Sequence, residues 1–118
     1  MRAFSFPKRE RLLNRADFVN ANREGRRHHT AHFSITFRKN GMGVSRLGIV
    51  TSKKTGNAVT RNRIRRLIRE VYRLHKAHVP QGCDILIAAR REAGNLHFWK
   101  VREELLDFFT AKRLGVLH

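Results

Sequence analysis

The segment from Asn57 to His78 constrains the fold more than any other part of the chain, because it combines high positive charge with a regular apolar pattern. Its large aliphatic side chains recur at helical spacing and are Ile64, Leu67, Ile68, Val71 and Leu74. Each residue advances about 100° around a helix axis, so these side chains fall on one face. The opposite face carries Arg61, Asn62, Arg65, Arg66, Arg69, Arg73 and Lys76. We therefore expect a long helix, capped by Asn57 and ended by Pro80, that packs on a sheet and presents a row of arginines outward.

The apolar patterns elsewhere predict one domain over residues 1–118. Helices are expected over residues 9–25 and 98–114, where apolar side chains recur at helical spacing. Strands are expected over residues 32–39, 46–52 and 84–89. The first of these strands alternates apolar and polar side chains, and the last is a continuous apolar run that is typical of a strand covered on both faces. The order helix, strands, helix, strand, helix indicates an α+β fold with helices packed on a small sheet.

The charge of the chain points to a polyanionic partner. Lys and Arg number 26 against 9 Asp and Glu, which gives a formal net charge of +17 and a pI near 11.8. Such a balance is the electrostatic footprint of nucleic-acid binding. A membrane surface fits less well, because basic amphipathic anchors expose apolar side chains beside their charge, and no apolar run approaches the ~20 residues of a membrane span.

Two terminal and compositional features add smaller expectations. Residues 1–10 are expected to form a flexible basic arm, because Pro7 blocks an early helix. Cys83 is the single cysteine, which excludes an internal disulfide and fits a reducing, cytoplasmic location.

The charge on the predicted arginine helix is arranged for binding. A merely solvated helix face alternates sign, because Glu–Lys pairs at i,i+4 stabilise it. Here Arg61, Arg65, Arg69 and Arg73 follow one another at i,i+4, so like charges repel and a polyanion would relieve the repulsion. The free N–H groups of the helix N-terminus, beside Lys53 and Lys54, add a phosphate site. The Walker order of residues is absent, which favours a polymer over a nucleotide.

No group of residues indicates catalysis or a metal site within the protein. His28 and His29 are adjacent and point to opposite faces if they lie on a strand, and few acids lie near them. Glu103 and Glu104 diverge on a helix, so they do not form the converging acids of a two-metal nuclease. We expect no catalytic residue and no metal ligand.

The stretch "SKKTGNAVTRNRIRRLIREVYR" closely resembles the signature of the bacterial ribonuclease P protein family. The segments "RLLNRADFVNANREG", "RLGIVTSKK" and "GCDILIAARRE" resemble the family's flanking elements, so the likeness covers about residues 8–112. It implies an α+β fold with a small mixed four-stranded sheet, three helices and a left-handed strand–helix–strand crossover, although such crossovers are right-handed in about 98% of cases.

The resemblance implies a function. The chain is expected to be the protein subunit of ribonuclease P, which binds the catalytic RNA and the 5′ leader of precursor tRNA and assists Mg²⁺-dependent removal of the leader. The Mg²⁺ is expected to be held by the RNA, and no obligate protein partner is expected. The expected RNA-binding residues are Lys53, Lys54, Asn57, Arg61, Asn62, Arg63, Arg65, Arg66, Arg69 and Arg73.

The resemblance also places a leader cleft between the first helix and the sheet. Its expected residues are Phe18, Asn22, Ser34 and Thr36. Asn22 and Thr36 stand where family members can carry aromatic side chains, so hydrogen bonding and charge are expected to carry more of the binding here. A single strand is held by a positive groove and stacking surfaces, which agrees with this set in kind.

Three other functions remain open from the residues alone. A non-enzymatic RNA binder such as a ribosomal protein shares the charge and the fold class. A DNA-binding module would use a short recognition helix, which the long arginine helix fits poorly. A stand-alone nuclease would need acids that the sequence does not gather.

Overall fold

The computed structural model describes residues 6–12 and 14–113 of the chain. Its helices are α1 (Arg15–Glu24), α2 (Ala58–Leu74) and α3 (Phe98–Arg113), and its strands are β1 (Arg26–His29), β2 (Phe33–Lys39), β3 (Arg46–Val50) and β4 (Cys83–Ala89). Short 3₁₀ turns η1 (Lys8–Glu10), η2 (Lys76–His78) and η3 (Arg91–Asn95) join them. None of the helices in the described ranges is long and apolar enough to cross a membrane.

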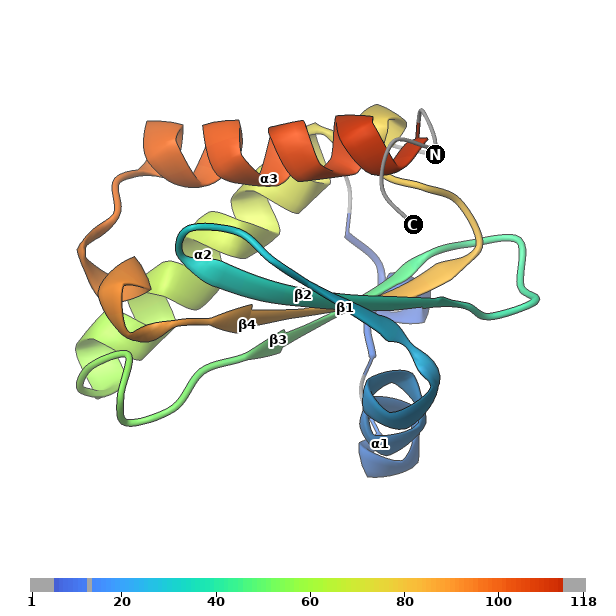
Figure 1. The fold of residues 1–118 in the computed structure, drawn as a ribbon, viewed down its shortest axis with the longest axis horizontal. Coiled ribbons are helices and arrows are strands. Elements are labelled where there is room, and N and C mark those ends of the chain that lie inside the picture. Colours follow the sequence, from blue (N-terminus) through green and yellow to red (C-terminus); the bar gives the residue numbers. More distant parts are fainter. Residues whose placement is uncertain (1–5, 13, 114–118) are drawn as a thin grey trace.

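The four strands form one mixed sheet in the order β1-β2-β4-β3. β3 runs parallel to β4, and the other two pairs are antiparallel. α2 and α3 cover one face of the sheet, and α1 lies against the other (Figure 1). The predicted α+β class, with three helices on a small mixed four-stranded sheet, is confirmed.

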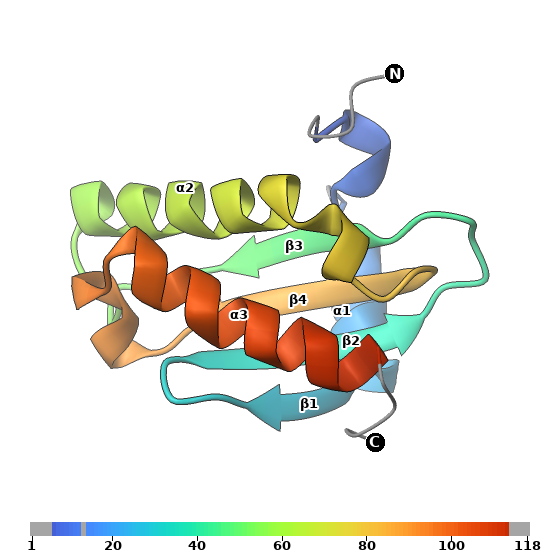
Figure 2. The same cartoon turned by 90° about the horizontal axis from the view of Figure 1, so that it is seen from above.

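The connection from β3 through α2 to β4 has the unusual hand. Seen from the side of α2 with both strands pointing upward, β4 lies to the left of β3, so the crossover is left-handed (Figure 2). The general rule for such units would have given the opposite hand. The hand that the resemblance implied is therefore confirmed, and it places the arginine helix over the β3 edge of the sheet (Figure 2).

The main core lies between the sheet and the pair α2 and α3. Its fully buried side chains come from β2, β4 and both helices, and include Phe33, Ile87, Ile68 and Phe109. A second, small cluster lies under α1, where Leu12, Ala21 and Leu86 are buried and Phe18 packs against them. The alternation of β2 explains this division, because Phe33, Ile35 and Phe37 face the main core while Ser34 and Thr36 face the side of α1.

The first helix begins later than predicted. We expected it from residue 9, but α1 starts at Arg15, with the Asn14 side chain accepting a hydrogen bond of 2.8 Å from the Asp17 N–H as its N-cap. Leu12 belongs to the sheet edge instead, because its N–H donates to the Leu47 carbonyl at 2.9 Å. Its apolar side chain fitted the helical pattern but is buried beside β3.

The expected flexible arm is docked where the structure describes it. Residues 1–5 lie outside the described residues. From there on, the Phe6 ring packs on Tyr72 with centroids 5.4 Å apart, and Glu10 forms a 2.8 Å ion pair with Lys76. These contacts join residues 6–10 to α2 and η2. The Phe6 side chain packs against the main core, and the flexibility of residues 1–10 stays a prediction.

Candidate RNA interface

α2 has the two faces that its sequence predicts. Its N-cap is Asn57, whose side chain accepts from the Thr60 N–H at 2.9 Å. Its buried residues are Ile64, Ile68, Val71 and Tyr72. Tyr72 was missing from the predicted stripe, although it lies four residues after Ile68 and its ring packs in the core. The predicted Leu67 and Leu74 are only half-buried.

The outer face of α2 presents arginine side chains to solvent. Arg66, Arg69 and Asn62 are exposed, and Arg65 is half-buried. Within the described ranges, none of these arginines has a carboxylate within salt-bridge distance. Arg73, at the end of the row, differs because it bonds the helix's single acid, Glu70, at 2.7 Å. The unneutralised charge is therefore concentrated in the middle of the helix.

Two of the predicted arginines are engaged with backbone carbonyls. Arg63 points away from the outer face, and its guanidinium donates to the Gly94 carbonyl at 3.2 Å and to the Leu96 carbonyl. It fastens α2 to η3, so the structure does not bring Arg63 to the arginine face with the others. Arg61 donates to the Gly56 carbonyl at 3.1 Å and closes the turn before the helix.

The turn before α2 needs a glycine at one position. Gly56 has φ of +149°, a region that side chains rarely adopt, and a Cβ there would lie 2.8 Å from Thr60 Cβ. Lys53 and Lys54 precede it and are exposed. The turn therefore places these two exposed lysines three and four residues before the N-cap of α2.

A cleft of about 490 Å³ lies between α1 and the sheet. The four residues predicted for the leader cleft, Phe18, Asn22, Ser34 and Thr36, all line it. The residues that line it come from α1 on one side and from the strands on the other, and Figure 1 shows α1 beneath the sheet. The four predicted residues thus line a single hollow in the described chain, two of them on α1 and two on β2.

Further residues of the cleft were not predicted. They are Arg15, Val19, Arg27, Val50, Leu86 and Ala88. Val19 and Val50 are large apolar side chains with exposed fractions of 47% and 41%, which is unusual unless such a surface has a partner. Leu86 and Ala88 are two residues apart on β4 and so share one face of that strand, a spacing that could have placed them in the cleft. Arg27 lies on β1, whose sequence RRHH has no apolar residue to reveal a strand.

Phe18 stands at the junction of the cleft with the arginine helix. It also lines a second hollow of about 290 Å³, together with Arg65 and Arg69 of α2. Its ring lies against β3 at Gly48, where a Cβ would come within 2.8 Å of two ring carbons. Gly48 therefore lets the ring approach the sheet, and the cleft and the arginine face meet across this ring.

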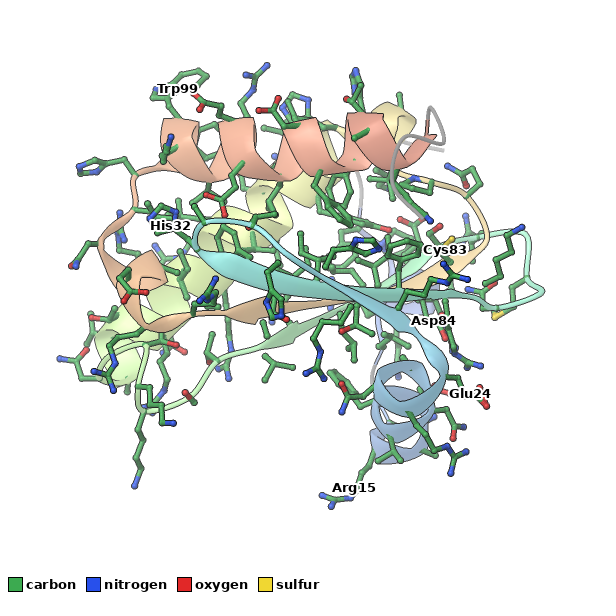
Figure 3. All side chains as sticks on the ribbon, in the orientation of Figure 1. Arg15, Glu24, His32, Cys83, Asp84 and Trp99 are labelled. Atoms are coloured by element: carbon green, nitrogen blue, oxygen red, sulfur yellow. The ribbon has the colours of Figure 1, made fainter. Side chains whose placement is uncertain are left out.

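An ionic cluster fixes α1 over the sheet. Asp84 of β4 is fully buried and accepts two hydrogen bonds of 2.8 Å from Arg46 and one of 2.9 Å from Asn40. Arg46 also reaches Asp17 near the start of α1 at 3.1 Å. Arg38 joins Asp84 at 3.2 Å to Glu24 at the end of α1 at 2.8 Å. Both ends of α1 are thus tied to one buried carboxylate, labelled with Glu24 in Figure 3.

The cluster also sets the charge state of its centre. Burial alone would raise the pKa of Asp84, but the hydrogen bonds from Arg46 and Asn40 and the charges of Arg46 and Arg38 lower it below its usual value. Asp84 is therefore an anion held by cations. No pattern in the sequence indicated this cluster, because its members come from four separate segments.

The histidines are not gathered into a ligand set. His28 stacks on Phe37 with centroids 5.2 Å apart, and His32 Nδ1 lies 2.8 Å from a Glu104 oxygen. His29 is exposed. Across residues 6–12 and 14–113, no three His, Cys, Asp or Glu side chains are placed to hold a metal ion.

An open cleft lined by apolar and hydroxyl side chains with a cationic rim, next to a helix face on which Arg65, Arg66 and Arg69 have no carboxylate partner among the described residues, suits the binding of RNA. Comparison with known proteins makes the class specific. The family model described as Ribonuclease P matches residues 6–113. The ribonuclease P protein components of Thermotoga maritima and Desulforapulum autotrophicum are 43% and 44% identical to the chain, over 87% and 92% of it and over 92% and 93% of theirs.

Solved structures agree with the sequences. The RNase P protein from Thermotoga maritima has a TM-score of 0.79 at 41% identity, covering 86% of this chain and 96% of that one. The RNase P protein of Staphylococcus aureus has a TM-score of 0.78 at 33% identity, covering 92% and 98%. The chain therefore belongs to the ribonuclease P protein family. The predicted function, a subunit of the endoribonuclease ribonuclease P in tRNA processing, is confirmed at the level of the family.

Proposed function

We propose that this protein binds the RNA component of ribonuclease P through the outer face of α2, and that its cleft holds the 5′ leader of precursor tRNA. The first contact is supported by the unneutralised side chains of Arg65, Arg66 and Arg69 on one helix face. Guanidinium groups bind phosphate as a planar fork, so a row of them suits an RNA backbone. Lys53 and Lys54 extend the same charged surface beyond the helix start.

The cleft suits a single strand in its composition. Phe18 supplies a ring for base stacking, Val19 and Val50 supply exposed apolar contacts, and Ser34 and Asn22 supply hydrogen-bonding groups. Base stacking on an aromatic side chain contributes about 1–3 kcal/mol per base. None of the described residues that line the cleft has a carboxylate, so none of them repels a phosphate backbone.

One observation carries the proposal: Phe18 lines both the cleft and the hollow that contains Arg65 and Arg69. The surface for the leader and the surface for the RNA component are therefore one continuous surface. A protein built in this way joins the two RNAs at a fixed distance, which is how a non-catalytic subunit can strengthen substrate binding.

Mg²⁺ enters this function through the RNA. The described carboxylates nearest the cleft, Asp17, Glu24 and Asp84, are engaged by Arg46 and Arg38, so their donor set does not fit a resident Mg²⁺. Catalysis of cleavage is accordingly assigned to the RNA component, and the protein binds and orients the precursor tRNA. The cytoplasm is the proposed location, where tRNA precursors are processed.

Cleavage of precursor tRNA tests the proposal. A bacterial ribonuclease P RNA is incubated at low Mg²⁺ with a precursor carrying a 5′ leader, with and without the protein, and the protein is also tested alone. We expect stimulated cleavage at the mature 5′ end, and none by the protein alone. Absence of stimulation, with tight binding to unrelated structured RNAs, would refute the assignment.

A further inference from the structure

Arg27 occupies a position in the cleft that the proposed function does not yet use. It lies on the edge strand β1, opposite Thr36 in the β1–β2 register, so both side chains belong to the cleft face of the sheet. Its side chain is solvent-exposed. Arg27 is therefore a cation at the rim of the hollow, beside its hydroxyl-bearing floor.

The guanidinium of Arg27 is held in place by a neutral partner. Its Nη2 donates to the Asn22 Oδ1 across the cleft wall at 2.8 Å. No carboxylate of the described chain lies within salt-bridge distance of it. The hydrogen bond orients the group without neutralising its charge, and it leaves the faces of the guanidinium plane open to a ligand. A group ordered in advance loses less freedom on binding.

Among the described residues that line the cleft, one has an aromatic ring, namely Phe18, and it packs over other strands than the one that carries Arg27. Phe18 packs over Gly48 of β3 and Leu86 of β4, whereas Arg27 belongs to β1 at the other edge of the sheet. The backbones of these strands are two or three strand spacings apart, or roughly 10–14 Å, and Asn22, which the guanidinium bonds, lies one helical turn from Phe18 on α1. Stacked bases are about 3.4 Å apart, so the two planar groups would contact different nucleotides.

We propose that Arg27 is a leader-binding residue, whose guanidinium plane stacks on a nucleobase of the leader at the end of the cleft opposite Phe18. This inference rests on the proposed function of the cleft and adds a second stacking position to it. Arginine stacks on bases through its delocalised plane, which lysine lacks. Asn22 is then a positioning residue that keeps the plane at the rim.

The test compares affinities for precursor tRNA and for mature tRNA. The protein is reconstituted with a bacterial ribonuclease P RNA, and both dissociation constants are measured for each variant. We expect Arg27→Ala to weaken precursor binding roughly 5- to 100-fold while leaving mature tRNA binding unchanged. Arg27→Lys should lose nearly as much affinity for the precursor, because lysine keeps the positive charge but has no planar guanidinium group to stack on a base. Unchanged precursor affinity in either variant would overturn the proposal.

Two further variants test whether precursor binding depends on the position of the Arg27 side chain in the cleft or only on the positive charge of β1. Arg26→Ala removes the same charge from the same strand, but its side chain faces away from the cleft, so precursor affinity should stay unchanged. Asn22→Ala removes the hydrogen bond that orients the guanidinium but keeps the guanidinium itself, so it should weaken precursor binding less than Arg27→Ala does. A loss for Arg26→Ala equal to that for Arg27→Ala would refute Arg27 as the contacting residue.

Phe18→Ala distinguishes a failure of this inference from a failure of the proposed function. If Phe18→Ala weakens precursor binding and Arg27→Ala does not, the cleft holds the leader and only the role of Arg27 is wrong. If neither variant changes the difference between precursor and mature tRNA, the leader is not held in this cleft. Urea unfolding of each variant verifies that the fold is retained.

Discussion

Replacing Gly48 by alanine tests the contact that positions Phe18. Gly48 does not have a positive φ, so alanine is allowed by the backbone. The added Cβ would lie 2.8 Å from two ring carbons of Phe18 and 2.8 Å from Leu86 Cδ2. Such overpacking costs about 1–3 kcal/mol, against a gain of about 0.4–1 kcal/mol from the less flexible unfolded chain. The net loss of stability should be about 1 kcal/mol.

A double-mutant cycle with Phe18→Ala isolates the contact. Without the ring, the new methyl group meets only the flexible end of Leu86, so Gly48→Ala should become neutral or stabilising by about 0.4–1 kcal/mol. The interaction energy between the two substitutions should therefore reach about 1–3 kcal/mol. The free energies of unfolding from urea denaturation give this value directly.

The same substitution should change function. The Phe18 ring lines both the cleft and the hollow beside Arg65, so a displaced ring changes the shape of the surface between them. Gly48→Ala should therefore weaken binding of precursor tRNA more than binding of the RNA component. Additivity of the two free energies within about 0.5 kcal/mol would refute the reasoning, because Phe18 would then not rest on β3 at Gly48.

Three further predictions follow from the charged residues. Arg65→Ala should weaken RNA binding with unchanged stability, whereas Arg63→Ala should lower stability by about 1–3 kcal/mol because two carbonyls lose their donor; filter binding and urea unfolding separate the two outcomes. If about five phosphates are neutralised, log K for a single strand should fall with log salt at a slope near −3.5, and a slope near zero would contradict phosphate binding. Asp84→Asn should cost about 3 kcal/mol, because Arg46 and Arg38 lose their buried anion. The pKa of Asp84 is lowered in the fold, so the stability that its ionised carboxylate contributes is present above the usual pKa near 3.8 and is lost as pH falls below that value. Between neutral pH and this acid range, the free energy of unfolding should therefore fall less for Asp84→Asn than for the native protein.

Local patterns in the sequence predicted the helices and strands that bury one row of side chains in the main core. α2 followed from its apolar period, and β2 from its alternation, since both place one row of side chains in the main core. β1 has only arginine and histidine, and its place comes from backbone pairing with β2, which leaves no apolar trace. The early start predicted for α1 was wrong because Leu12 serves the β3 edge and not the helix.

The site could be predicted where a motif marks it. The four cleft residues came from the family resemblance and do lie in one hollow. Arg63 belongs to the same motif, yet it fastens η3 by a contact about 30 residues away in sequence, which no local pattern encodes. Arg27 and the Asp84 cluster were missed for the same reason, because they depend on which strands become neighbours.

The sheet order has a consequence for synthesis. β4 is the last strand to leave the ribosome, yet it lies between β2 and β3 and pairs with both. A nascent chain ending at residue 82 therefore has the β1–β2 pair and β3, but it lacks the strand that joins β2 to β3, so the apolar face of α2 has no complete sheet to pack on. Most of the core forms only after residues 83–113 emerge, and these contacts span long stretches of chain. The arginine helix is translated before β4, but its apolar face meets the complete sheet only once β4 has emerged, so its outer face becomes an ordered surface only after a later segment of the chain has been made.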